Sequence, residues 1–252
     1  MKRDYFWLTE EQFGRLAALL PTDTRGKRRV NDRRVISGIV HVLKSGGRWV
    51  DAPDAYGPRK TLYNRFVRWA AKGIWVDIFH ALVSAGGTPA EVLIGSSAVK
   101  AHRCASGGKG GKQNQAIGRS RGGRTTKIHA LTDGLCRPIA FLLTGDQVAD
   151  CTAGDLLLEQ MPKSPIVHAD KGYDSNAIRN KVEGKGAMPN IPLKANRRWR
   201  ICFSPFLYRD RNAIERMFGR LKDFRRVATR YDRSATNFLA AVCLVAIVSY
   251  WL

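Results

Sequence analysis

The chain has 252 residues, enough for one large domain or two smaller ones. A hydrophobic fraction of 44% is sufficient for a packed core and excludes wholesale disorder. The 43 lysines and arginines outnumber the 21 aspartates and glutamates, giving a net charge of +22. We therefore expect a polyanionic partner, with a merely soluble basic surface as the alternative.

Four short helical segments are predicted in residues 1–88. Thr9 and Gln12 form a capping-box pattern, Asn31 is placed to cap a second helix, and Gly46 is placed to end it. A third segment, residues 59–73, has an apolar stripe and a basic face, and a fourth follows to residue 87. The basic face is formed by Arg59, Lys60, Arg65 and Arg68. This favours a helix-turn-helix-like module whose third helix meets DNA, although a solvated bundle face would show the same pattern.

A basic, glycine-rich segment follows. Residues 99–127 contain eight basic side chains and no acidic one, and "GGKGGKQNQAIGRSRGGRTTK" cannot bury a core. We expect residues 103–127 to form a mobile loop, either a plain linker or a segment that folds over a phosphate backbone.

The remaining segments predict a mixed-sheet α/β core. "EVLIGSSAVK" is a strand, and "TTKIHALTD" and "RPIAFLLTG" form a hairpin that turns at Asp133–Gly134. A helix, the strand "PIVHAD", another helix, the short strand "MPNIPLKA" and a long basic helix from Pro205 onward complete the order. The apolar residues 238–252 are too few for a membrane span and are typical of a buried core helix.

The cysteines and the first residues of the chain bear on the cellular compartment in which the protein is expected. Five cysteines occur without CxxC spacing, which indicates neither a disulfide framework nor a zinc site and fits a reducing cytoplasm. The start, "MKRDYFWLTEEQ", is charged where a signal peptide would be apolar. We therefore expect a cytoplasmic protein without a membrane partner.

Common catalytic motifs are not matched. "GSSAV" lacks the last glycine of the G-x-S-x-G nucleophile elbow, and "GGKGGK" lacks phosphate-loop spacing. The five histidines form no HxxxH metal pair. Serine hydrolases, phosphate-loop nucleotidases and helix-borne zinc enzymes are thus disfavoured.

Two acids stand out instead. Asp170 closes an apolar strand, and acids at such strand ends point into the usual site crevice of α/β enzymes. Glu215 lies on a predicted helix, and carboxylates brought together from a strand end and a helix require a divalent cation between them. Two Mg²⁺ ions in such a site support in-line phosphoryl displacement. The alternative is local: Asp170 caps the next turn and Glu215 pairs with an arginine.

Glu215 belongs to a wider pattern, Y-x-x-R-x-x-x-E-x-x-x-x-x-x-K. On a helix, Tyr208, Arg211, Glu215 and Lys222 share one stripe. They would supply an aromatic ring that can stack on a base, two cations for phosphate and a carboxylate for metal.

Taken together, these motifs resemble bacterial insertion-sequence transposases of the DDE class, in the group called insertion sequence family five. The resemblance covers the helical N-terminal region, "AIGRSRGGRTTKIHALTD", "HADKGYD", "PLKANRRW", "RNAIERMFGRLKDFRRVATRYDR" and the apolar tail. It implies a DNA-binding region at residues 1–88 and an RNase H-like core at 89–252. It also implies cleavage and strand transfer at terminal inverted repeats with Mg²⁺ or Mn²⁺, a dimer on double-stranded DNA, and association with the nucleoid.

The resemblance places the second acid on Asp170 and the glutamate on Glu215, with Tyr208, Arg211 and Lys222 in the supporting signature. The family's first acid stands in Ile-Asp-Ser-[Ser/Thr], whereas this chain has Gly95 at that position. Because glycine cannot bind metal, we expect impaired catalysis.

Three other acids were weighed as replacements for the missing one. Asp133 is expected at a hairpin turn, and Asp146 and Asp150 as loop or cap residues, so none is expected to replace the lost carboxylate. Two alternatives to a transposase remain: a non-catalytic DNA-binding protein or repressor, and a basic RNA-binding protein.

Overall fold

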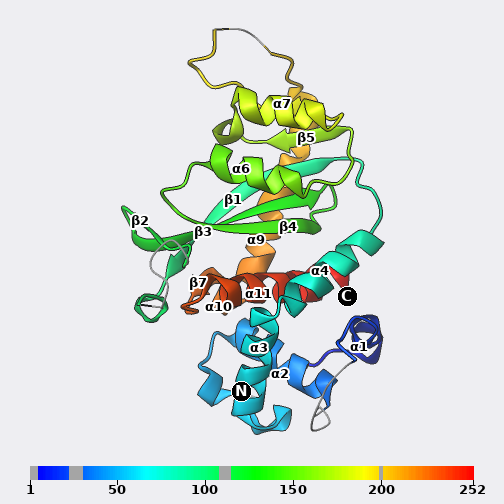
Figure 1. Cartoon of the computed structure of the whole chain (residues 1–252), viewed down its shortest axis with the longest axis vertical. Coiled ribbons are helices and arrows are strands. Elements are labelled where there is room, and N and C mark those ends of the chain that lie inside the picture. Colours follow the sequence, from blue (N-terminus) through cyan, green and yellow to red (C-terminus); the bar gives the residue numbers. More distant parts are fainter. Residues whose placement is uncertain (1–4, 23–30, 108–114, 199–200) are drawn as a thin grey trace.

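The computed structural model describes residues 5–22, 31–107, 115–198 and 201–252 (Figure 1). Its strands form one mixed sheet with the order β2-β3-β1-β5-β6, in which β4 also pairs with β3 and β7 with β1. The strands are β1 (Val92–Ala101), β2 (Gly118–Ser120), β3 (Gly123–Asp133), β4 (Pro138–Gly145), β5 (Ile166–Ala169), β6 (Met188–Asn190) and β7 (Thr229–Arg230).

The helices fall into an N-terminal group, a pair between the strands and a C-terminal group. The N-terminal group is α1 (Glu10–Ala17), α2 (Asp32–Ser45), α3 (Arg59–Ala71) and α4 (Ile74–Ala85). The pair between the strands is α6 (Asp150–Glu159) and α7 (Asn176–Gly184). The C-terminal group is α8 (Pro205–Tyr208), α9 (Asn212–Lys222), α10 (Arg225–Ala228) and α11 (Ala235–Ala246).

The local signals for the N-terminal helices are confirmed. Thr9 and Gln12 form a reciprocal capping box at α1, and the Asn31 side chain accepts a hydrogen bond from the Arg34 amide at α2. Gly46 ends α2 with φ +76, a left-handed conformation that favours glycine.

The sheet follows the predicted order of elements. The strands β4, β3 and β1 are antiparallel neighbours, whereas β5 and β6 add to β1 in parallel through the helical connections α6 and α7. Helix α6 packs against β3, β4 and α7, and α9 packs against β1 (Figure 1). The sheet is therefore covered on both faces, as a parallel-containing sheet requires.

Two predicted segments differ from the structure. The long basic helix is broken into α8, a 3₁₀ turn at Arg209–Arg211, α9 and α10. The break between α9 and α10 lies at Phe224, which leaves the helical conformation and buries its ring in the core. The loop predicted for residues 103–127 is partly wrong, since β2 and the first part of β3 lie within it. Residues 108–114 of that loop lie outside the described residues.

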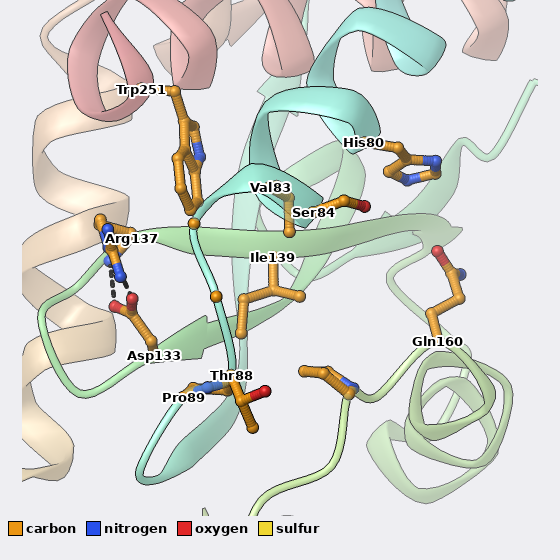
Figure 2. A pocket seen from close by; sticks show the side chains of 13 residues that line it. His80, Val83, Ser84, Thr88, Pro89, Asp133, Arg137, Ile139, Gln160 and Trp251 are labelled. Carbon is orange, nitrogen blue, oxygen red and sulfur yellow. Dashed lines mark hydrogen bonds and ion pairs between the residues drawn. The ribbon is translucent and has the colours of Figure 1, made fainter.

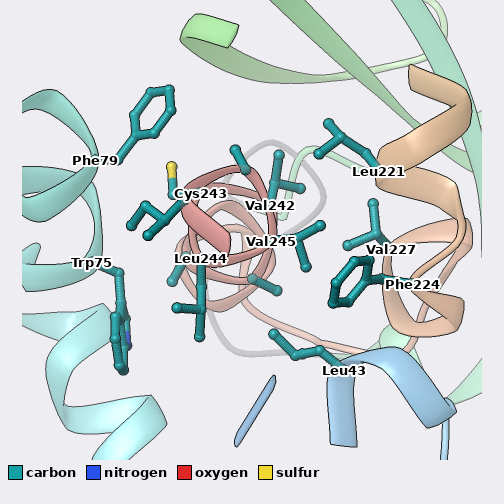
Figure 3. Packing of buried hydrophobic residues seen from close by; sticks show 14 of the residues in the cluster. Leu43, Trp75, Phe79, Leu221, Phe224, Val227, Val242, Cys243, Leu244 and Val245 are labelled. Atoms are coloured by element: carbon teal, nitrogen blue, oxygen red, sulfur yellow. The ribbon is translucent and has the colours of Figure 1, made fainter. Parts of the chain in front are cut away.

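One apolar cluster joins the N-terminal helices to the C-terminal ones. Helix α11 packs against α2, α3, α4, α9 and β4. Figure 3 shows side chains of α11, Leu244 among them, surrounded by Leu43 of α2, Trp75 of α4 and Leu221 of α9. The prediction of a buried C-terminal core helix is confirmed. Within the described residues, no helix is long and apolar enough to cross a membrane.

We expect the helical region and the sheet to unfold together, because they share this core. Leu244 is fully buried, so Leu244→Ala should lower the free energy of unfolding by about 2–5 kcal/mol. Tryptophan fluorescence and far-ultraviolet circular dichroism should report one denaturant midpoint. Leu156 on α6 is half exposed, and Leu156→Ala should change the free energy by about 0.5 kcal/mol or less. Two separate midpoints in the unmodified protein would contradict a shared core.

Candidate active site

The parallel pairing of β1 with β5 brings the first-acid position beside Asp170. Ile94 is the register partner of Ala169, so the next residues in this register are Gly95 and Asp170. Register partners in a pleated sheet point to the same face. The structure therefore places the glycine next to the acid that sequence analysis assigned to the site.

The direction of the missing side chain is also defined. A Cβ added at Gly95 would point to Ile214 on α9, 3.0 Å from its Cδ1 atom, and Ile214 precedes Glu215 in the chain. The neighbouring side chain, Ser96, points to the opposite face and donates a hydrogen bond to Asp150 on α6. A carboxylate at position 95 would thus lie on the face of the sheet that α9 covers.

Both local interactions that the sequence offers as an alternative to metal binding are present: Asp170 caps the next turn, and Glu215 pairs with an arginine. Asp170 Oδ1 accepts a hydrogen bond of 2.6 Å from the Gly172 amide and starts a 3₁₀ turn. Glu215 Oε1 lies 2.5 Å from Arg211 Nη2, and the Glu215 side chain is 63% exposed. Each contact uses one oxygen of a carboxylate. Hence these contacts leave the second oxygen of each carboxylate available to another ligand.

Tyr208 lies within electrostatic reach of both acids. Burial raises the pKa of the Tyr208 phenol, the positive charge of Arg211 opposes this, and the charges of Asp170 and Glu215 raise the pKa further. The Arg211 guanidinium also stacks over the Tyr208 ring at 5.4 Å. Three residues from the predicted stripe thus lie together, although they belong to α8, a 3₁₀ turn and α9 rather than to one helix, and Tyr208 among them is within electrostatic reach of Asp170.

Lys222 completes the stripe but points to the sheet. Its Nζ donates to Ser97 Oγ at 2.6 Å and to the Ala98 carbonyl at 3.2 Å, and burial lowers the pKa of its ammonium. Ser97 is two residues beyond Gly95 and shares its face. The ammonium of Lys222 therefore contacts the strand that carries Gly95, on the same face of the sheet as Gly95.

No group of three or more His, Cys, Asp or Glu side chains placed to hold a metal ion occurs among the described residues.

A hollow on another part of the molecule does not offer a second acidic centre. A cavity of about 580 Å³ lies near the start of β1, lined by residues that include His80, Asp133 and Trp251 (Figure 2). Asp133 is held by Arg137 Nε at 2.7 Å and by backbone amides. It pairs with Val92 at the start of β1, three residues before Gly95. The expectation that Asp133 is a turn residue is confirmed.

The basic residues of α3 are not equivalent. Arg59, Lys60 and Arg68 are exposed, as an interface with DNA requires. Arg65 is less exposed, and its guanidinium forms an ion pair with Asp32 and stacks on Trp69. Two further residues of this helix, Tyr63 and Asn64, are exposed as well. Their positions follow from the helical spacing of Lys60 and Arg68.

A polar network that the sequence did not reveal supports the site. His168 Nε2 lies 3.0 Å from Glu91, and its Nδ1 lies 3.1 Å from the amide nitrogen of Asn190. Asn190 also exchanges two hydrogen bonds with the backbone of Ser204, the residue that caps α8. The network ties α8, which carries Tyr208, to the strand that ends at Asp170.

The motif "HADKGYD" contains a second acid, Asp174, whose role is structural. Its buried carboxylate accepts hydrogen bonds from Arg179 Nε, Arg197 Nε and the Lys194 amide at 2.7–2.9 Å. Burial alone would raise the pKa of Asp174, but these hydrogen bonds outweigh burial and lower it to about 2. Asp174 thus fastens α7 and the segment around Lys194 to the end of the β5 motif.

With this geometry in view, comparison with known families identifies the chain. Residues 87–251 match a family model described as "Transposase DDE domain", and residues 8–79 match one described as "Putative transposase of IS4/5 family". The larger match covers more than half of the chain, so this chain belongs to the DDE transposase family, a class of enzymes that cleave and join DNA.

Relatives among known proteins agree with this assignment. A "Putative transposase for insertion sequence element IS6501" from Brucella ovis is 31% identical over 129 residues, covering 51% of this chain and 98% of the relative. A "Putative transposase for insertion sequence element IS402" from Burkholderia cepacia is 33% identical over 121 residues, covering 44% of this chain and 55% of the relative.

A solved structure supports the fold. The piggyBac transposase synaptic complex with hairpin DNA matches with a TM-score of 0.50 at 11% identity, over 94% of this chain and 69% of that one. The RNase H-like fold class is confirmed by this likeness and by the domain match.

Asp174 makes folding sensitive to acid. Because its pKa in the folded state lies below the ordinary value of 3.8, its contribution is complete above about pH 4 and is lost as pH falls toward 2. Asp174→Asn should cost about 3–5 kcal/mol at neutral pH, since it leaves Arg179 buried without a charge partner. It should also flatten the dependence of unfolding free energy on pH between 4 and 2. Urea titrations across this range measure both effects, and an unchanged slope in the variant would refute the assignment.

Proposed function

We propose that this transposase binds the terminal inverted repeats of an insertion sequence and is built for Mg²⁺-dependent strand cleavage and transfer, with catalysis impaired in this chain by Gly95. The observation that carries the proposal is the register that sets Gly95 beside Asp170, with its absent side chain directed at the helix of Glu215. A site of three carboxylates is thus laid out with one member missing.

Asp170 and Glu215 would hold the cation, Mg²⁺ or Mn²⁺. The fit is partial: each carboxylate has one oxygen engaged by Gly172 or Arg211 and a second oxygen outside those contacts, but the third ligand is lost. When bound, the cation supplies Lewis-acid stabilisation of charge on the phosphoryl oxygens. Loss of one carboxylate weakens its binding and its placement.

The remaining residues act on the DNA strand itself. Arg211 is stacked on Tyr208 and paired with Glu215, so its guanidinium is held in place to meet a phosphate oxygen. Lys222 places an ammonium beside the first-acid strand, where it can orient a phosphate. Tyr208 offers a partly exposed ring on which a base can stack.

The exposed face of α3 would bind the repeat. Arg59, Lys60 and Arg68 supply charge for backbone phosphates, and Tyr63 and Asn64 lie on the same helix for contacts to bases. A dimer would hold two element ends, with target DNA as the third duplex, in the bacterial cytoplasm at the nucleoid. The region of residues 1–88 would thus serve DNA recognition and residues 89–252 the chemistry.

A second candidate function follows from the same glycine. Because Gly95 removes a metal ligand while the exposed basic residues are retained, a DNA-binding protein or repressor derived from a transposase is consistent with the chain. A basic RNA-binding role leaves Asp170 and the arrangement around Tyr208 without purpose.

Restoring the acid should restore cleavage. Ile214 Cδ1 is the end of a flexible side chain and needs to move only a few tenths of an ångström, so Gly95→Asp should be accommodated. We expect Mg²⁺-dependent cleavage of a terminal-repeat duplex to rise about 10³-fold or more over the unmodified chain. Gly95→Asn, which adds the same bulk without charge, is the matched control and should give no increase.

The cleavage assay tests both proposals about position 95, namely that Gly95 impairs catalysis and that this position belongs to the site. Robust cleavage by the unmodified chain would refute the claim of impairment. Failure of folded Gly95→Asp to cleave would refute the site assignment, and Glu215→Gln in the restored chain should abolish the gain.

The α3 face should dominate DNA binding. Replacing Arg59, Lys60 and Arg68 together with glutamine should weaken binding and reduce the slope of log K against log salt by about 2–3, near 0.9 per lost phosphate contact. A control triple, Arg15, Lys163 and Lys185 to glutamine, removes the same charge from other exposed places. Fluorescence anisotropy over a salt series measures both, and equal slopes for the two triples would count against α3.

A further inference from the structure

Asp150 is not the loop or cap residue expected from its sequence position. It is the first residue of α6, but its carboxylate reaches across to the sheet. Asp150 Oδ1 accepts a hydrogen bond from Ser96 Oγ at 3.0 Å and one from Lys127 Nζ at 3.2 Å. The residue is thus tied to the strand position next to Gly95.

The other oxygen of Asp150 faces Asp170. A Cβ added at Gly172 would lie 2.7 Å from Asp170 Oδ1 and 3.3 Å from Asp150 Oδ2, so one glycine separates the two carboxylates. Within the described part of the chain, no residue donates a hydrogen bond to Asp150 Oδ2. Gly172 carries no side chain that would fill this space.

A buried and unpartnered nitrogen lies beside the same carboxylate, on the side of Oδ1. His129 is fully buried on β3, directly across from Ser96, and its Nδ1 lies 3.8 Å from Asp150 Oδ1 without a hydrogen-bond partner. Its Nε2 is occupied by Thr144 Oγ1 at 2.8 Å. Burial lowers the pKa of His129 to about 4, so the ring is neutral near pH 7. A polar ligand beside Asp150 would satisfy this nitrogen.

The buried phenol of Tyr173 lies within electrostatic reach of both Asp150 and Asp170. Burial raises the pKa of Tyr173, and the charges of Asp150 and Asp170 raise it further. Two carboxylates within reach of one buried ring repel each other unless a cation lies between them. Lys127 offsets part of the negative charge on Asp150. It binds Oδ1, however, whereas Oδ2 is the oxygen that lies closer to Gly172.

We propose that Asp150 and Asp170 together bind a divalent cation around Gly172, a site that does not require an acid at position 95. Mg²⁺ and Mn²⁺ are commonly held by one or two protein carboxylates with water and phosphate in the remaining positions. Ser96 and Lys127 act as the outer partners that orient the Asp150 carboxylate, as hydrogen-bonding groups around metal ligands usually do. The α6 N-terminus adds a favourable partial positive charge for the anionic ligand.

This inference deepens the proposed function, since it shares Asp170 with the proposed cleavage site. It is nevertheless tested without DNA and without cleavage. The full-length unmodified protein is titrated with Mn²⁺ alone, and free Mn²⁺ is measured by electron paramagnetic resonance. Asp150→Asn and Asp170→Asn should each weaken Mn²⁺ binding about tenfold or more.

The matched control is Asp155→Asn. Asp155 lies on the same helix and is likewise paired with a lysine, but that lysine is Lys181 of α7 rather than a residue of the sheet. Its replacement should leave Mn²⁺ affinity unchanged. Unchanged affinity in Asp150→Asn would overturn the inference, and loss of binding only in Asp170→Asn and Glu215→Gln would do the same while leaving the proposed cleavage site intact. An unmodified chain that takes up no Mn²⁺ also overturns it.

A second variant covers the case in which Asp150→Asn unfolds. Asp150→Cys places a thiolate at the same position, and direct coordination should then favour Cd²⁺ over Mn²⁺. We expect a Cd²⁺–thiolate absorption band in the difference spectrum against the unmodified chain, which already contains the neighbouring Cys151. Absence of an added band in folded Asp150→Cys would overturn the inference.

Discussion

The pairing of β1 with β5 is the constraint on which the rest of this site depends. The two strands lie side by side although they are far apart in sequence, and the register Ile94–Ala169 sets position 95 next to Asp170. A shift by one residue would turn Gly95 toward α6 and Ser96 toward α9. The antiparallel pairing of β1 with β3 along nine residues holds that register from the other side. A side chain at position 95 would therefore point in one defined direction, toward Ile214 of α9.

The second support of the site is the apolar cluster around α11. Helix α9 carries Glu215 and packs on β1 through Ile214, while α11 packs against α9 and the N-terminal helices together. Arg226 adds a polar tie, because its guanidinium donates to the Gly47 carbonyl and lies near Asp232. The position of Glu215 is thus coupled to the packing of the N-terminal region, which links the proposed DNA-recognition surface with the acidic centre through one core.

Local signals in the sequence predicted local structure well, and contacts between distant segments account for the failures. Capping residues gave the starts of α1 and α2, and the hairpin at Asp133 gave β3 and β4. The break at Phe224 could not be predicted, because the helical pattern continues through it and only burial of the ring against other elements ends the helix. Likewise, the sequence predicted that Asp170 follows a strand and that Glu215 lies on a helix, and the structure has both positions. The partners of Arg65 and Asp150, namely Asp32 and Ser96, lie 33 and 54 residues away and carry no local signature.

The two faces of the sheet reconcile the proposed impairment of catalysis with the proposed cation site. A carboxylate at position 95 would approach Asp170 from the face of α9, where Glu215, Arg211 and Lys222 are gathered. Asp150 approaches from the face of α6, where Ser96, Lys127 and His129 surround it. Both acids can share Asp170, which lies beyond the end of β5, but only the first would bring a cation between Asp170 and Glu215. In-line displacement needs the attacking and leaving oxygens stabilised together. In the proposed site, Asp150 therefore supplies a second carboxylate ligand beside Asp170 without replacing the geometry that Gly95 removes.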